Sequence, residues 1–176
     1  MILFCLRHGQ SEYNILGLCN DDPDRKVRLT EQGRHEAERA AGELRQAPLE
    51  RIFCSELSRT RETAEIVNLF HGVPIQAHPV INDIRSGCDG RPVAEYFRAI
   101  ADDRLNTRVG DGETLLEHKR RILGFLDWLR VQPYATVLVV AHEETLRVFA
   151  AYARNLDDEE MIDLEVGNCA VFSFEL

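Results

Sequence analysis

The sequence has no apolar run approaching the roughly 20 residues that a membrane-spanning helix requires. Residues 1–6 are apolar, but this stretch is too short for the core of a signal peptide and no basic segment precedes it. We therefore expect a soluble, cytoplasmic protein that does not enter a membrane.

Paired cysteines and excess positive charge are also missing. The five cysteines lie far apart, and no two form the C-x-x-C pair that metal sites and redox centres use. Free thiols are the simplest interpretation. With 21 Lys and Arg against 30 Asp and Glu, the net charge is -9, which disfavours nucleic acid and anionic membranes as partners. Any anion-binding site must therefore be local.

Short apolar or β-branched runs alternate with longer segments of helical period, and 176 residues fit a single domain spanning 1–176. This alternation predicts an α/β fold with a mainly parallel sheet. The predicted strands are 2–6, 51–54, 74–76, 136–140 and 170–175, with 136–140 central and the last at an edge. The predicted helices are 29–44, 58–70, 113–129 and 143–153, and 78–92 is expected to be a long functional loop.

The first strand leads into Arg7-His8-Gly9, and Ser11 is a candidate helix cap just beyond. Such strand-to-helix turns present free backbone N–H groups and the positive end of a helix dipole, so they favour phosphate. Gly9 allows close approach of the backbone. Alone, the motif fits an ordinary turn with solvated side chains equally well.

Two further turns repeat this arrangement. Arg59 lies in the first turn of a helix, where a cation is disfavoured unless an anion pairs with it, and His142 follows the central strand. Ligand sites of open α/β sheets form beyond the carboxyl ends of the strands. We therefore expect Arg7, His8, Arg59 and His142 to converge.

With these segments in place, nearly the whole chain resembles the histidine phosphatase superfamily, which includes the cofactor-dependent phosphoglycerate mutases. Further matches follow the family's order: Asn14, Leu29-Thr30-x-x-Gly33, Ser55-x-x-x-Arg59 with Thr63-Ala64, and Gly112-Glu113-Thr114. The resemblance implies a phosphoglycerate mutase-like, three-layer α/β/α sandwich. It also implies a nucleophile at His8, a proton donor at Asp83, and a phosphate pocket made of four residues: Arg7, Asn14, Arg59 and His142.

The sequence departs from the family pattern around the acid. Asp83 stands where most relatives carry Glu, so its side chain is shorter by a methylene group. Glu143 and Glu144 follow His142, where small residues are common, and would repel a phosphate unless one is protonated or points away. In the acid phosphatase branch the donor directly follows the second histidine, which makes Glu143 a rival. We favour Asp83, since acids at a helix start complement its dipole.

The predicted function is phosphate monoester hydrolysis through a covalent phosphohistidine. A neutral imidazole is nucleophilic near neutral pH without a base, so neither a metal nor another cofactor is required. The alternatives are a mutase, disfavoured by the short chain, and a noncatalytic module that binds phosphorylated ligands. The expected substrate is a small phosphorylated metabolite or a phosphoprotein. The sequence does not determine the oligomeric state.

Overall fold

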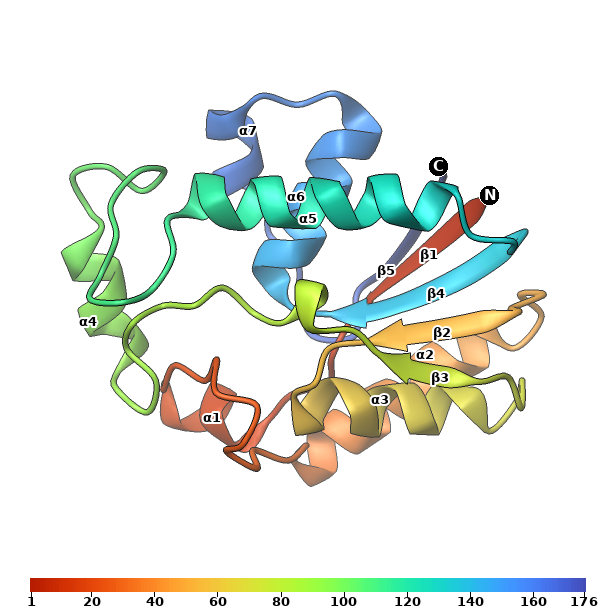
Figure 1. Cartoon of the computed structure of the whole chain (residues 1–176). Helices are drawn as coiled ribbons and strands as arrows, with labels where there is room; N and C mark the ends of the chain where they lie inside the picture. Colours follow the sequence, from red (N-terminus) through yellow and green to blue (C-terminus); the bar gives the residue numbers. More distant parts are fainter.

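The computed structural model describes residues 1–176 and contains one five-stranded sheet with the strand order β3-β2-β4-β1-β5 (Figure 1). Four strands are parallel to their neighbours, while β5 pairs with β1 in the antiparallel direction. The strands are β1 (Ile2–Arg7), β2 (Arg51–Cys54), β3 (Ile75–Ala77), β4 (Thr136–Ala141) and β5 (Val171–Glu175). The predicted mainly parallel sheet is confirmed.

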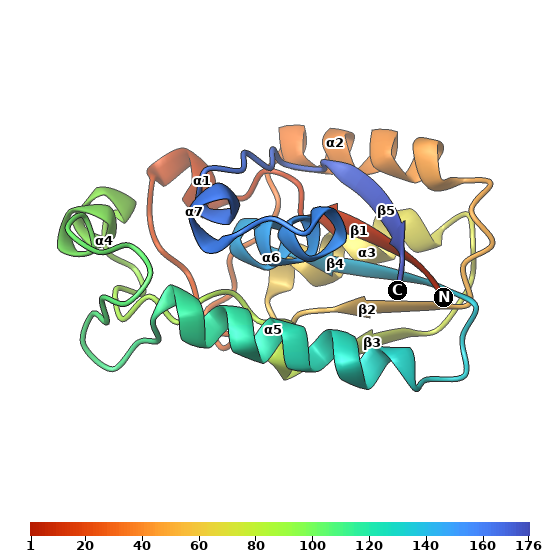
Figure 2. The ribbon, with the colours of Figure 1, turned by 90° about the horizontal axis from the view of Figure 1, so that it is seen from above.

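Helices cover both faces of this sheet. The helices are α1 (Glu12–Leu16), α2 (Glu31–Leu44), α3 (Ser58–Asn68), α4 (Val93–Ala99), α5 (Leu115–Arg130), α6 (Glu143–Arg154) and α7 (Asp158–Ile162). Figure 1 shows α2 and α3 on one face and α5, α6 and α7 on the other. Viewed from above, α5 lies along the β2–β3 side and α6 over β4 and β1 (Figure 2). The three-layer α/β/α sandwich is therefore confirmed.

The central strand β4 is buried along its whole length, which explains its continuous apolar sequence. Because side chains alternate across a strand, Val137 and Val139 pack on the α5–α6 side, whereas Leu138 and Val140 pack on the α2–α3 side. The sheet is thus fixed from both faces, and the carboxyl ends of β1, β2 and β4 lie together at one edge.

The predicted elements are present, with ends shifted by one or two residues, but the structure adds helices that the sequence analysis did not predict. The helices α1, α4 and α7 have only five to seven residues. Such lengths are too short for a clear helical period. The irregular segment 78–92 is confirmed, except for one 3-10 turn at Pro79–Ile81. No helix is both long and apolar enough to cross a membrane.

A glycine pair joins the turn after β1 to the start of α2. A Cβ atom on Gly9 would lie 2.2 Å from the carbonyl oxygen of Gly33, and one on Gly33 would lie 2.0 Å from the carbonyl oxygen of Gln10. Thr30 caps α2 by accepting the Gly33 N–H at 3.0 Å, and its own N–H donates to Gln10 O at 2.9 Å. The close approach that Gly9 permits is therefore with α2.

Candidate active site

Three side chains meet at the carboxyl ends of the central strands. His8 follows β1, His142 follows β4, and Arg59 lies in the first turn of α3. Arg59 Nε lies 3.0 Å from Nε2 of His8, Arg59 Nη2 lies 3.1 Å from Nδ1 of His142, and the two imidazole centroids are 5.4 Å apart. The predicted convergence of these residues is confirmed.

The hydrogen bonds of His8 define its tautomer. Nδ1 lies 2.7 Å from the carbonyl oxygen of Gly9, which can only accept, so Nδ1 carries the proton. Nε2 then presents a lone pair toward Arg59. Burial and the positive charge of Arg59 hold the pKa of His8 well below its ordinary value, so the ring is neutral. His8 thus has the form that a nucleophile requires.

His142 has the opposite tautomer. Its Nδ1 accepts from Arg59, so Nε2 carries the proton and donates to Ser55 Oγ at 2.8 Å. Burial and the charge of Arg59 also lower the pKa of His142 well below its ordinary value. The Oγ of Ser55 is in turn 2.7 Å from Oγ1 of Thr60. The orientation of the ring is therefore fixed by the segment that follows β2.

Arg59 uses every nitrogen of its guanidinium group. Besides the two histidines, Nη1 donates to Asn20 Oδ1 at 2.5 Å, and Nη2 donates to Asn20 O at 3.0 Å and to Asp83 Oδ2 at 2.8 Å. The side chain is only 5% exposed. A phosphate placed beside His8 would find this planar, charged donor already aligned, because a guanidinium can bind two phosphate oxygens at once.

Asp83 contacts both Arg59 and His142. Its Oδ2 is 2.8 Å from Arg59 Nη2 and 3.4 Å from His142 Nδ1, and its Oδ1 accepts the backbone N–H of Ile84 at 3.0 Å. The shorter side chain therefore does not keep this carboxyl away from the two basic residues. Its position is compatible with the predicted role as proton donor.

The rival acid Glu143 is bound by two arginines. Its Oε2 lies 2.9 Å from Arg7 Nη1, and its Oε1 accepts from Arg147 Nη2 at 2.6 Å. Arg7 Nη1 also donates to the carbonyl oxygen of Val166. Much of the repulsion that Glu143 would exert on a phosphate is thus offset by Arg7 and Arg147.

Glu144, on the same first turn of α6, is less completely paired. Its Oε1 accepts from Arg147 at 2.8 Å, but its Oε2 is buried without a hydrogen-bond partner. Burial raises the pKa of Glu144 above its ordinary value, and the charge of Arg147 offsets this only in part. The protonated form of this side chain is accordingly favoured more than in water.

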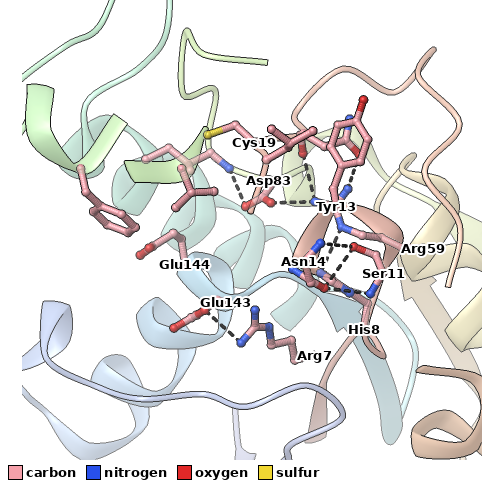
Figure 3. A pocket seen from close by; sticks show the side chains of 15 residues that line it. Arg7, His8, Ser11, Tyr13, Asn14, Cys19, Arg59, Asp83, Glu143 and Glu144 are labelled. Carbon is pink, nitrogen blue, oxygen red and sulfur yellow. Dashed lines mark hydrogen bonds and ion pairs between the residues drawn. The ribbon is translucent and has the colours of Figure 1, made fainter. Parts of the chain in front are cut away.

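Asn14 occupies a different place from the other predicted phosphate ligands. It is exposed, and its Oδ1 accepts from the backbone N–H of Ser11 at 2.9 Å and from the Ser11 hydroxyl at 3.0 Å. These bonds belong to the cap of α1, and they leave the amide NH₂ group as the part able to meet a phosphate. Asn14 is one of the residues that line the cavity (Figure 3).

These residues surround a cavity of about 210 Å³ (Figure 3). All six predicted site residues except His142 line it directly, and His142 lies behind Arg59 and Asp83. The lining residues are Arg7, His8, Ser11, Tyr13, Asn14, Leu18, Cys19, Asn20, Arg59, Asp83, Ile84, Val93, Phe97, Glu143 and Glu144. The two arginines, which are the only lysine or arginine side chains in the lining, lie near His8. Apolar groups from α4 and the segment after α1 form another part of the wall.

Sequence reasoning missed several residues that hold the site together. Asn20 binds Arg59 twice, but it lies in an irregular stretch without any recognisable pattern. Ser55, which holds His142, was visible only as part of the Ser55-x-x-x-Arg59 match. Arg121 also escaped notice, because three of its contacts are with backbone carbonyl oxygens about 40 residues away in sequence. The structure contains no cluster of three or more His, Cys, Asp or Glu side chains able to hold a metal ion.

Known proteins resemble this chain in sequence and in fold. The adenosylcobalamin/alpha-ribazole phosphatase of Salmonella typhimurium is 31% identical over 160 residues, which cover 86% of this chain and 78% of the relative. The 2,3-bisphosphoglycerate-dependent phosphoglycerate mutase of Cytophaga hutchinsonii is 31% identical over 189 residues, covering 98% and 87%. The crystal structure of the alpha-ribazole phosphatase from Shigella flexneri superimposes with a TM-score of 0.89 and covers 100% of this chain and 91% of that one. At 23% identity this likeness shows the fold alone.

The predicted family and enzyme class agree with these relatives. The relative from Salmonella typhimurium is a phosphatase, which supports the assignment of this chain as a phosphatase. The sequence profile described as "Histidine phosphatase superfamily (branch 1)" matches residues 3–176, nearly the entire sequence. The chain belongs to the histidine phosphatase superfamily, branch 1.

Proposed function

We propose that the protein hydrolyses small phosphate monoesters in two steps through a phosphohistidine on His8. The observation that carries this proposal is the tautomer of His8, whose Nε2 lone pair faces Arg59 while Nδ1–H is held by a carbonyl oxygen. Only the unprotonated nitrogen can attack phosphorus, and its lone pair becomes available when Arg59 Nε turns from His8 to a phosphate oxygen. Arg59 then lies where it can stabilise the transferring phosphoryl group.

In the first step, a bond forms between His8 Nε2 and phosphorus while the ester P–O bond breaks. Arg7 and Arg59 hold the nonbridging oxygens and Asn14 contributes its amide NH₂, while His142, whose Nδ1 accepts from Arg59, acts through that arginine. A phosphate oxygen replaces Asp83 Oδ2 as the acceptor of the Arg59 Nη2 hydrogen bond. Asp83 must carry a proton at that moment. The departing alkoxide receives this proton.

In the second step, water attacks phosphorus, the Nε2–P bond breaks, and inorganic phosphate leaves. Asp83, now a carboxylate, accepts the proton from the attacking water, which returns the site to its initial state. Between the two candidate acids, Asp83 is favoured because it lies 2.8 Å from the arginine that contacts His8, whereas Glu143 is bound by Arg7 and Arg147.

Hydrolysis is favoured over mutase activity by the charges around the cavity. A mutase that returns phosphate to a second hydroxyl must also hold a bisphosphorylated intermediate, which calls for cationic side chains at two places. Both arginines of this cavity are near His8, and the remaining charged side chains are carboxylates. A mutase is the alternative, because the chain is also similar to the phosphoglycerate mutase of Cytophaga hutchinsonii. A substrate of metabolite size suits a cavity of about 210 Å³ and fits the named phosphatase relatives better than a phosphoprotein.

The experiment is a screen of the purified protein against phosphorylated metabolites and phosphopeptides without added metal, followed by rapid, acid-free quenching. We expect inorganic phosphate as product and one added phosphoryl group on the intact protein, mapped to His8. Transfer of the phosphate to a second hydroxyl of the substrate would instead identify a mutase. If the protein binds a phosphorylated compound but forms neither product, it is a noncatalytic module that binds phosphorylated ligands.

A further inference from the structure

The segment that carries Asp83 lies outside the sheet, so its position depends on side-chain contacts. Arg121, in the second turn of α5, supplies three of them. Its Nη1 donates to the carbonyl oxygens of Val80 at 2.6 Å and Asn82 at 3.1 Å, and its Nη2 donates to that of Asp83 at 3.3 Å. One guanidinium group thus binds three carbonyls within four residues, the last of which belongs to the proposed acid itself.

Arg121 is held in turn by Glu113. Nε of Arg121 donates to Oε2 of Glu113 at 3.2 Å, and Nη2 donates to Oε1. The Glu113 side chain is 2% exposed. Oε1 also accepts the Arg85 N–H at 3.1 Å, while the Glu113 N–H donates to Arg85 O at 2.7 Å. The backbone around Asp83 is therefore held on both sides: Arg121 binds carbonyl oxygens within residues 80–83, and Glu113 binds the backbone of Arg85.

The same group reaches the helix that starts after His142. Nδ1 of His118 lies 2.8 Å from Arg121 Nη2 and must accept, because a guanidinium only donates. Nε2–H of His118 then faces Oγ1 of Thr145 on α6, at 3.5 Å. Arg121 thereby links the Asp83 segment to the helix behind His142, without itself lining the cavity.

Stability alone is a poor reason for this arrangement. A buried ion pair loses much of its attraction to the cost of desolvation, and packed apolar side chains commonly stabilise a core as well. What a guanidinium provides and an apolar group cannot is a fixed direction for several carbonyl oxygens at once. That direction matters where a carboxyl group must meet a leaving oxygen.

We propose that Arg121, fixed by Glu113, is a positioning residue that holds the backbone of Val80–Asp83 so that the Asp83 carboxyl reaches the leaving-group oxygen. The inference rests on the proposed function, in which Asp83 is the acid. Arg121 acts only through Asp83 and touches neither the phosphate nor His8.

The test compares Arg121→Met with Arg120→Met, an exposed neighbour on the same helix. A misplacement of about 1 Å in a reacting group costs about 10²-fold in rate, so alkyl phosphate cleavage by Arg121→Met should fall by that order. The p-nitrophenolate burst from p-nitrophenyl phosphate should stay close to wild type, because this leaving group needs no proton. Arg120→Met should match wild type with both substrates.

A double variant separates positioning from general damage. In Asp83→Asn/Arg121→Met, the second change should add nothing to the loss caused by Asp83→Asn, since both act through the same carboxyl. Equal losses with aryl and alkyl esters, or losses that multiply in the double variant, would overturn the role of Arg121. Normal alkyl cleavage by Asp83→Asn alone would refute the proposed acid and, with it, this positioning role.

Glu113→Gln keeps the shape of the side chain and covers the case in which Arg121→Met does not fold. It weakens the hold on Arg121 while retaining a carbonyl acceptor. We expect the same selective loss with alkyl esters, smaller than in Arg121→Met and again absent from the aryl burst. A Glu113→Gln protein that folds and cleaves alkyl esters at the wild-type rate would contradict the proposal.

Discussion

The cationic centre of the site and its carboxylate rim differ in how tightly their side chains are held. We define the centre as His8, Arg59 and His142, and the rim as Asp83, Glu143 and Glu144. In the centre, Arg59 and His142 are 5% and 1% exposed, whereas in the rim Asp83 and Glu143 are 23% and 31% exposed. Donors and acceptors of the centre all have partners, while one buried oxygen of Glu144 has none.

This difference indicates a division of labour. The centre is arranged before a substrate arrives, so it should serve every phosphate ester in the same way. In the rim, Asp83 must exchange its contact with Arg59 for one with the leaving group. Its contribution should therefore depend on how basic the leaving oxygen is. Substitutions in the two regions should differ in their dependence on substrate as well as in size.

The largest effect is expected from His8→Ala. Removing a nucleophile costs on the order of 10⁵-fold or more in turnover, and here the loss should be the same for aryl and alkyl esters. Circular dichroism should show an unchanged fold, and intact-protein mass spectrometry after acid-free quenching should show no phosphoryl group. The exposed His35→Ala serves as control. More than a trace of turnover in His8→Ala would move the nucleophile elsewhere.

Arg59→Lys should come next. An ammonium group cannot bind two phosphate oxygens in a plane while contacting both histidines, so we expect a loss of about 10²- to 10³-fold with all esters. Inhibition by vanadate should weaken in parallel. Arg61→Lys on the same helix, where the side chain is 68% exposed, should behave as wild type. Near-normal rates with weakened vanadate inhibition would show that Arg59 does not contact the transferring phosphoryl group.

The rim should show selectivity by leaving group. Asp83→Asn should slow alkyl phosphates by roughly 10²- to 10⁴-fold while sparing the aryl burst, and phosphoenzyme should accumulate because water lacks its base. Glu143→Gln should do neither. Rapid-quench kinetics with both substrates measures the two steps. Accumulation in Glu143→Gln, with normal alkyl cleavage by Asp83→Asn, would reverse the assignment of the acid.

The smallest effect concerns the buried Glu113 and the half-buried Glu144, whose pKa shifts have opposite directions. Burial raises the pKa of Glu113, but His118, Arg121 and a backbone N–H lower it more, so it lies well below its ordinary value. Its stabilising contribution is present above the ordinary value and is lost only as pH falls through the lowered pKa. The raised pKa of Glu144 has the reverse sign, because its ionisation in the folded state reduces stability as pH rises.

Urea unfolding from about pH 5 to about pH 8 can measure this contrast. Glu113→Gln should be less stable than wild type by about 3 kcal/mol across the range, as expected for a broken buried pair. For Glu144→Gln, the difference from wild type should shift in favour of the variant as pH rises. A constant difference for Glu144→Gln would show that Arg147 fully compensates the buried charge.

The sequence predicts the centre of the site better than its rim. The centre could be located because parallel strands end at one edge, so residues directly after β1 and β4 had to meet. The rim was harder. Asp83 was placed only by resemblance, and the pairing of Glu143 with Arg7 depends on how α6 faces β1. Arg121 gave no signal at all, because nothing in a sequence shows which backbone carbonyls a helix will face. The predicted roles of all six site residues, including Asn14 and Asp83, stay predictions.

The contact between Gly9 and Gly33 extends the functional part of the molecule beyond its cavity. No residue of α2 lines the cavity, yet this helix presses backbone against backbone on the turn that holds His8. Both positions exclude even a methyl group, so neither can change alone and neither can be compensated by the other. Random mutagenesis should therefore find inactivating substitutions at Gly33, although no residue of its helix contacts the ligand cavity.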